Sequence, residues 1–197
     1  MTKLRIVGVD PGFANIGLAI VDLMAVGGST LVATELITTS PSKTKIAQIA
    51  DEKRRLEEIE DSFLAFIEEY KPSILAMEEP GKCLMRRNIN GKVVWQTNPS
   101  LLRTSCLMWG AIHGVCRSKD IYCVSIGSQE VKKTLCNKRT ASKEDMVAKV
   151  KAFYPAYSDW PKTKKVEHVA DAAGIAITSF KDPAVMVMLK KLRSSLC

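Results

Sequence analysis

The fold is decided by residues 4–22, which read LRIVGVDPGFANIGLAIVD. Two β-rich apolar runs lie on either side of a Pro-Gly turn, and the carboxylate of Asp10 ends the first run. A third run, STLVATELITT, follows at residues 29–39 after a Gly-Gly pair. Three consecutive strands with short links predict an antiparallel meander. Asp10 would then stand at the end of a strand, carried out of a hydrophobic run onto a sharp turn.

The rest of the chain alternates helical and β patterns. Apolar residues spaced three and four apart predict one amphipathic helix from about Thr44 to Tyr70. Crossover helices make the later strands parallel to one another. The predicted fold class is therefore α/β, with a mixed five-stranded sheet of three antiparallel strands and then two parallel ones, and helices on both faces. The further elements expected are a strand SILAMEE at 73–79, a helix from the N-cap Asn98 to about Lys119, a strand IYCVSIG at 121–127, a helix at 143–154 opened by Ser142 with Asp145, and a last helix over about 166–180.

Length and composition limit the class of protein. The 197 residues, 46% of them apolar, predict a single domain over 1–197. Lysine and arginine outnumber aspartate and glutamate by 29 to 21, a net charge of +8, which favours an anionic partner such as nucleic acid. Without a bilayer-length apolar run or a signal-peptide pattern, we expect a cytoplasmic protein with no membrane partner. Six scattered cysteines without a CxxC pair predict reduced thiols and no zinc site.

Acidic residues gather at the predicted strand ends and on the last helix. A carboxylate at the carboxyl end of a strand projects into the crevice where α/β sheets bind ligands, and both Asp10 and Glu78 occupy such positions. Two carboxylates forced close together repel, and a divalent cation relieves that repulsion. In VEHVADAAGIAI at 166–177, His168 lies three residues and Glu167 four residues before Asp171, so either pair shares one helix face. Oxygen-rich sets of this kind favour Mg²⁺ or Mn²⁺ over zinc.

Four motifs resemble those of one family when they are taken together in order. They are GVDPGFANIGLAIV at 8–21, ILAMEE at 74–79, SQEVKKTL at 128–135 and EHVADAAGIAIT at 167–178. Over residues 4–180 the chain resembles the RuvC Holliday junction resolvases, within the RNase H-like nuclease superfamily. The resemblance implies an RNase H-like fold in which Asp10, Glu78 and Asp171 bind metal. It also implies that His168 completes the metal site, with Glu167 as a less favoured substitute.

The resemblance carries further expectations about chemistry and assembly. Lys132 and Lys143 match basic residues that contact the scissile region, while Lys138 and Arg139, with Lys133, are basic neighbours expected to contact DNA. Two Mg²⁺ ions per site, for which Mn²⁺ would substitute, would hydrolyse a phosphodiester to leave 5′-phosphate and 3′-hydroxyl ends. His168 would position the attacking water or carry its proton. A homodimer would cut four-way junctions, or other branched DNA, by paired symmetric nicks.

One segment departs from the family pattern. Residues 79–97, EPGKCLMRRNINGKVVWQT, are longer than the family segment, and the Asn-Gly pair in them predicts an inserted basic β-hairpin at about 82–97. Gly81 stands where the family has an aromatic residue that inserts at the junction centre, so we expect Trp95 or Met85 to take over as a wedge. The insertion fits a phage or prophage version of such an enzyme. The hairpin residues expected to contact DNA are Arg86, Arg87, Lys92 and Trp95.

Each interpretation has a structural rival. Asp10 also suits a simple turn residue, His168 a surface helix residue, the lysines a solvated face, and Trp95 a packing residue of its own hairpin. The helix after Asn98 is apolar enough to form a dimer interface or to be buried against the sheet. Its candidate interface residues are Leu101, Leu102, Cys106, Met108, Trp109 and Ile112, with Gly110 and Gly114. The alternative functions are a related nuclease acting on RNA or other branched DNA and a non-catalytic junction-binding protein. A sugar kinase or actin-like ATPase would need a far longer chain.

Overall fold

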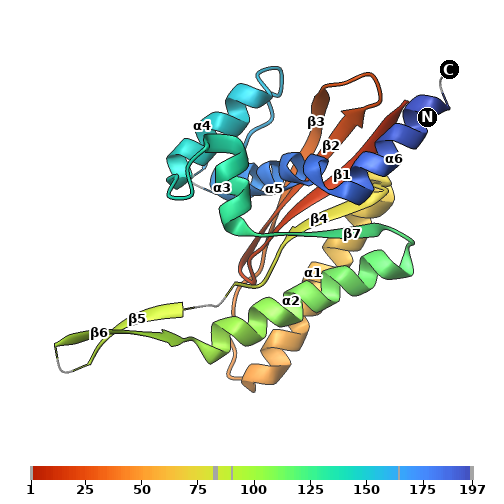
Figure 1. The fold of residues 1–197 in the computed structure, drawn as a ribbon. Coiled ribbons are helices and arrows are strands. Elements are labelled where there is room, and N and C mark those ends of the chain that lie inside the picture. The colour runs from red at the N-terminus through yellow and green to blue at the C-terminus, as the bar shows by residue number, and fades with distance from the viewer. Residues whose placement is uncertain (1, 82–83, 90, 164, 196–197) are drawn as a thin grey trace.

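A computed structural model describes residues 2–81, 84–89, 91–163 and 165–195, without the side chains of residues 84–87 and 89. Its main sheet has the strand order β3-β2-β1-β4-β7 (Figure 1). The first three strands are antiparallel neighbours, whereas β4 runs parallel to β1, and β7 runs parallel to β4. The predicted mixed sheet and fold class are therefore confirmed. The strands are β1 (Lys3–Pro11), β2 (Asn15–Met24), β3 (Ser29–Thr38), β4 (Ile74–Glu78) and β7 (Tyr122–Ile126).

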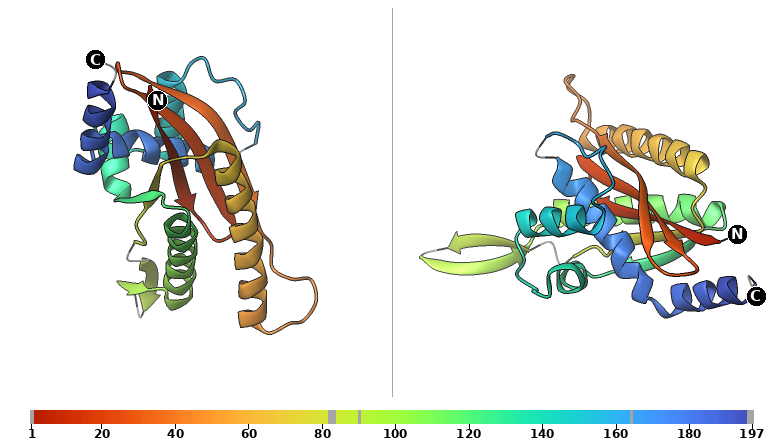
Figure 2. Two further views of the ribbon diagram at one scale, coloured as in Figure 1. Left: turned by 90° about the vertical axis from the view of Figure 1, so that its right-hand side faces the viewer. Right: turned by 90° about the horizontal axis from the view of Figure 1, so that it is seen from above.

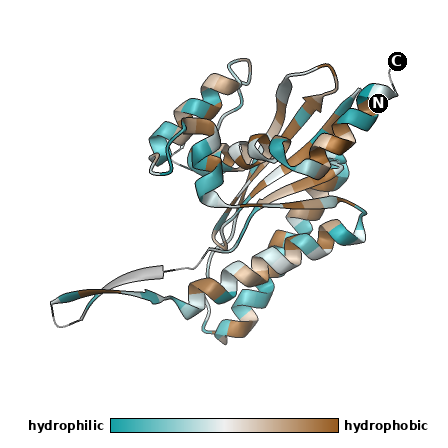
Figure 3. Cartoon of the chain, viewed as in Figure 1, coloured by the Kyte–Doolittle hydropathy of each residue, from teal (hydrophilic) through white to brown (hydrophobic). Residues whose placement is uncertain are grey.

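Helices cover both faces of this sheet and enclose two separate cores (Figure 2). Because neighbouring residues of a strand point to opposite faces, Ile6 packs in the core under α5, while Val7 packs with Phe63 of α1. Figure 3 shows the apolar residues that follow the central strands between these layers. The helices are α1 (Gln48–Tyr70) and α2 (Pro99–Ser118) on one face, with α3 (Ser128–Cys136), α4 (Lys143–Phe153), α5 (Val166–Thr178) and α6 (Pro183–Ser194) contributing to the core on the other.

Helix boundaries follow the capping residues. The Asn98 side chain accepts a hydrogen bond from the Leu101 amide at 3.2 Å, and Ser142 forms the predicted capping box with Asp145. Two boundaries and one element differ from expectation. Helix α1 begins at Gln48, later than expected, and its N-cap residue Ala47 makes no side-chain capping bond. Helix α3 was not among the expected elements, and α5 ends at Thr178, where a short 3₁₀ turn over Ser179–Lys181 follows.

The predicted hairpin is present as a second, two-stranded sheet of β5 (Leu84–Ile89) and β6 (Lys92–Thr97). Gly91 at its tip has φ of 78°, a conformation that glycine adopts without strain, whereas Asn90 lies outside the described residues. The hairpin follows β4 and projects away from the main sheet (Figure 1 and the right view of Figure 2).

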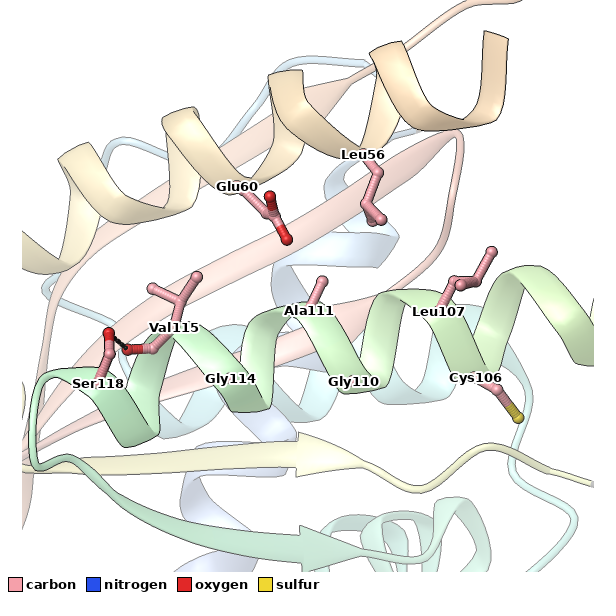
Figure 4. Close-up of a pocket in the computed structure, with 9 residues that line it drawn as sticks. All are labelled: Leu56, Glu60, Cys106, Leu107, Gly110, Ala111, Gly114, Val115 and Ser118. Atoms are coloured by element: carbon pink, nitrogen blue, oxygen red, sulfur yellow. Dashed lines mark hydrogen bonds between the residues drawn. The ribbon is translucent and has the colours of Figure 1, made fainter. Parts of the chain in front are cut away.

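Helix α2 has a buried side and an exposed side. Met108 and Ile112, two residues of the expected dimer interface, are buried in the core with α1 and the sheet, so they are structural residues. The opposite side borders an open cavity of about 600 Å³ between α1 and α2 (Figure 4).

Cys106, Cys116, Cys123 and Cys136 are free thiols, while Cys83 and Cys197 lie outside the described residues. Within the described part of the chain, no single helix is long and apolar enough to cross a membrane.

Candidate active site

Parallel pairing of β1 and β4 brings two carboxylates to the same end of the sheet. Val9 lies beside Met77 in this pairing, and the next residues along the two strands are Asp10 and Glu78. Both strands are buried on both faces up to this point, so their acidic residues stand at the boundary between core and surface. The Asp10 side chain is 20% exposed, so solvent reaches it.

Helix α5 lies directly on the strands because two glycines leave room for its backbone. A Cβ atom at Gly17, the partner of Asp10 in β2, would lie 2.0 Å from the carbonyl oxygen of His168. A Cβ atom at Gly8 would likewise lie 2.0 Å from the carbonyl oxygen of Ala172. No side chain larger than hydrogen fits at either position. The two glycines therefore fix the height and rotation of α5, and with them the placement of His168 and Asp171.

His168 faces Asp10. Its Nδ1 atom lies 2.8 Å from Oδ2 of Asp10. This hydrogen bond raises the pKa of His168, and burial opposes the effect. The rotation of α5 therefore directs His168 towards the strand-end carboxylates, so the alternative of a freely solvated surface histidine is wrong for this ring.

Two carboxyl groups of the site hold their protons unusually tightly. Burial raises the pKa of Glu78 to about 7, and the negative charges of Asp10 and Asp171 add to the effect. Burial also raises the pKa of Asp171 to about 6, with Asp10 again contributing. The positive charge of Lys132 and the hydroxyl of Ser128 oppose this rise in the pKa of Glu78. The site is thus a partly buried group of like charges, which a cation would stabilise.

The donor set fits a hard divalent cation. Three carboxylates and one imidazole converge on the carboxyl end of β1 and β4, and carboxylate oxygens are preferred ligands of Mg²⁺ and Mn²⁺. As the side chains stand, no three His, Cys, Asp or Glu residues of the described ranges are close enough to enclose a metal ion. Binding would therefore draw these side chains together, which relief of their mutual repulsion favours.

Basic residues flank the acidic set to different degrees. The positive charge of Lys132 on α3 lowers the pKa of Glu78. Lys143 at the start of α4 forms an ion pair with Glu167, with 3.1 Å between Nζ and Oε2. Lys133, Lys138 and Arg139 are exposed around the end of α3, and none of them forms an ion pair with an acidic residue in the described ranges. The structure thus brings Lys132 and Lys143 to the site and leaves the other three on the surrounding surface.

Comparison with known proteins identifies the family. The family model described as "Crossover junction endodeoxyribonuclease RuvC" matches residues 6–179. The chain belongs to the RuvC family. A RuvC protein of Prochlorococcus marinus is 28% identical over 179 residues, covering 91% of this chain and 98% of the relative. One of Clavibacter michiganensis is 32% identical over 75 residues, and that match spans only 34% of the relative's length.

Solved structures of RuvC and of a second resolvase have the same fold. A Thermus thermophilus RuvC in complex with a Holliday junction substrate superposes with a TM-score of 0.67 at 23% identity, covering 89% of this chain and 92% of that one. The yeast mitochondrial Holliday junction resolvase Ydc2 superposes with a TM-score of 0.58 at 15% identity, over 97% of this chain and 82% of its own. The RuvC-like arrangement therefore extends over most of the chain.

The hairpin lies apart from the acidic site of this RuvC-family chain. Lys92 is exposed, and the Trp95 side chain is 62% exposed, so Trp95 is not packed away within its own hairpin. Arg86 pairs with Trp95 and Arg87 with Val94 through the strand backbones, but both arginine side chains lie outside the described part of the structure, as does that of Met85. The described part of the hairpin thus presents Lys92 and Trp95 to solvent.

Two residues near the site were not given these roles by the sequence. Ser128 opens α3 immediately after β7, and its hydroxyl lowers the pKa of Glu78. Its sequence signal was the strand-Gly-Ser order, which places a serine at the same sheet edge as Glu78. Glu167 was considered only as a substitute ligand, whereas the structure pairs it with Lys143.

Proposed function

We propose that this protein is a metal-dependent endonuclease that resolves four-way DNA junctions by paired, symmetric cuts, leaving 5′-phosphate and 3′-hydroxyl ends. The observation that carries the proposal is the convergence of Asp10, Glu78, Asp171 and His168 at one sheet edge, in a chain of the RuvC family. A protein that only bound phosphate would gain nothing from carboxylates at that edge, because they repel the DNA backbone.

The residues divide into metal-holding and phosphate-facing groups. Asp10, Glu78 and Asp171, with His168, would hold two Mg²⁺ ions, or Mn²⁺ in their place. When bound, such ions activate a water molecule and stabilise the leaving 3′ oxygen of an in-line hydrolysis. His168, whose Nδ1 lies beside Asp10, would accept or return a proton at its ring nitrogens. Lys132 and Lys143 supply positive charge beside the carboxylates, where it offsets negative charge developing on the phosphate.

DNA contacts extend outward from this centre. Lys133, Lys138 and Arg139 lie on the exposed surface beside α3 and would contact the phosphate backbone. On the projecting hairpin, Arg86, Arg87 and Lys92 would hold the junction arms. Trp95, which is 62% exposed, would insert at the branch point, as apolar wedges do in proteins that unstack DNA.

A homodimer fits this reaction because two symmetric cuts need two active sites related by a two-fold axis. The exposed side of α2 is the surface we assign to the dimer. It presents Leu107, Gly110 and Gly114 beside Leu56 of α1, so small and apolar residues allow a second helix to approach closely (Figure 4). We expect the enzyme to act in the cytoplasm, in the host cell if it is encoded by a phage.

The test is cleavage of matched labelled substrates: a mobile four-way junction, linear duplex, single-stranded DNA and an RNA/DNA hybrid, each with Mg²⁺ or EDTA. Paired nicks at symmetric positions in the junction alone, and only with Mg²⁺, are expected. Tight junction binding without cutting in Mg²⁺ or Mn²⁺ would point to a non-catalytic binding protein. Cleavage confined to another substrate would retain the site and change the assigned substrate.

A further inference from the structure

Glu167 and His168 are adjacent in sequence, yet their side chains have different partners. His168 Nδ1 faces Asp10 at 2.8 Å, whereas Glu167 Oε2 binds the Lys143 ammonium at 3.1 Å. The second oxygen of Glu167 lies 4.0 Å from Nε2 of His168, on the side of the ring away from Asp10. Glu167 therefore stands between Lys143 and the outer edge of the imidazole, not among the strand-end carboxylates.

The backbone of Lys143 is held in a helix, whereas its side chain is largely exposed. It is the first residue of α4, where the capping box of Ser142 and Asp145 sets the helix start, and α4 packs on α5 through Met146 and Val150. Its side chain is 59% exposed. The position of the ammonium group thus depends on which carboxylate it pairs with, because a lysine side chain rotates freely about four bonds.

Lys143 has competing carboxylates within reach of its charge. The positive charge of Lys143 lowers the pKa of Asp171. The negative charges of Asp171 and Asp10 in turn raise the pKa of Lys143. An ammonium group paired with Asp171 or Asp10 would occupy the oxygen atoms that a divalent cation needs. In the structure the ammonium is instead held by Glu167, whose side chain is 31% exposed.

We propose that Glu167 is a positioning residue that anchors the Lys143 ammonium beside the acidic set and keeps it from pairing with Asp171 and Asp10, which stay available to Mg²⁺ or Mn²⁺. The inference rests on the proposed function of that site. The two neighbouring residues then have separate roles. His168 belongs to the metal-holding group, whereas Glu167 positions the Lys143 ammonium group that faces the phosphate.

Calorimetric titration with Mn²⁺ tests this without any DNA. Glu167→Gln is expected to weaken Mn²⁺ binding roughly fivefold, the size of a partly exposed ion pair, because the released Lys143 competes for the carboxylates. The double variant with Lys143→Ala removes the competitor and should bind Mn²⁺ as tightly as Lys143→Ala alone. If Glu167 were itself a ligand, the double variant would stay weaker than Lys143→Ala, and that result would overturn the proposal, as would unchanged binding by Glu167→Gln.

A matched control is Glu68→Gln, which breaks an exposed pair with Lys119 of 2.8 Å and should leave Mn²⁺ binding unchanged. Junction cleavage gives a second readout: Glu167→Gln should need more Mg²⁺ for half-maximal rate and recover at saturating Mg²⁺, whereas the loss in Lys143→Ala should persist. A slowed rate in Glu167→Gln at every Mg²⁺ concentration would contradict the proposal. If wild-type protein cut no junction, the proposed function would fail while the Mn²⁺ titrations still decided the role of Glu167.

Discussion

The acidic end of the sheet and the β5–β6 hairpin follow each other directly in the chain but are held in opposite ways. Asp10 and Glu78 end buried strands, and α5 presses on β1 and β2 through glycines that admit no side chain. Every described side chain of β6 is exposed, and among the described residues β5 and β6 pair with each other in a sheet of their own. A lone two-stranded ribbon is marginally stable in water. Under the proposed function, the core would fix the geometry of the chemistry, whereas the hairpin would serve recognition of the substrate.

The sharpest way to break this division is to remove one charge at the buried end. Asp10→Asn should slow junction cleavage by at least about a thousandfold, because the metal contribution it supports is worth several kcal/mol. Junction binding, measured by gel shift in EDTA, should remain. Full cleavage by this variant with Mg²⁺ would remove Asp10 from the site.

Packing at the same end should be nearly as sensitive. Gly17→Ala places a methyl group 2.0 Å from the His168 carbonyl oxygen, so α5 must move. We expect a loss of about 2 to 3 kcal/mol in unfolding free energy, measured by urea denaturation, together with reduced cleavage. Gly81→Ala, where a Cβ meets no atom within 4 Å, is the control. Equal stability of the two variants would show that α5 is not seated on the glycine.

The hairpin should respond in recognition and not in chemistry. Trp95→Ala should lower junction cleavage about tenfold, the size of one lost aromatic stacking contact, with Mn²⁺ affinity unchanged. Val94→Ala, on the other face of the same strand, should have little effect. Junction cleavage by Trp95→Ala at the wild-type rate would refute the wedge, and weakened Mn²⁺ binding would show that the two regions are coupled.

The smallest expected effect is a pH dependence of stability in the metal-free protein. The pKa of Glu78 is raised to about 7 in the folded state, from an ordinary value of 4.5. The folded state therefore binds this proton more tightly than the unfolded state does. The free energy of unfolding that comes from this proton is fully present below pH 4.5 and is lost as the pH rises through about 7. When the pH rises from 5 to 8 in EDTA, the unfolding free energy of Glu78→Gln should fall by roughly 1 to 2 kcal/mol less than that of wild type.

Glu79→Gln, an exposed neighbour, should behave as wild type in the same denaturation series. If all three proteins lost equal stability between pH 5 and 8, the repulsion assigned to the acidic end would be absent.

The sequence predicted the sheet and the meeting of Asp10 with Glu78 because both depend on local patterns. Alternating apolar runs define the strands, and a crossover helix makes β4 parallel to β1. Two strand-end carboxylates must then lie at one edge. The turn alternative for Asp10 is compatible with this, since β1 ends at Pro11 and the Gly12 amide donates a hydrogen bond to the Asp10 carbonyl oxygen at 3.0 Å.

The remaining features depend on tertiary contacts that no local pattern encodes. Whether His168 or Glu167 faces Asp10 depends on the rotation of α5, which is set by its contact with Gly17. Helix α3 has nine residues and no side-chain cap, so its sequence carries little helical signal. Ser128 affects the pKa of Glu78 because α3 begins where β7 ends. The same holds for Met108 and Ile112, whose burial is decided by the side of α2 that meets the sheet.

The most direct test of the account is the location of bound manganese by anomalous diffraction from crystals grown with Mn²⁺. We expect anomalous density bounded by Asp10, Glu78 and Asp171 beside His168, present in the wild type and lost in Asp10→Asn. Manganese bound elsewhere in the crystal, with no density among these carboxylates, would contradict the claim that the end of β1 and β4 is the catalytic centre.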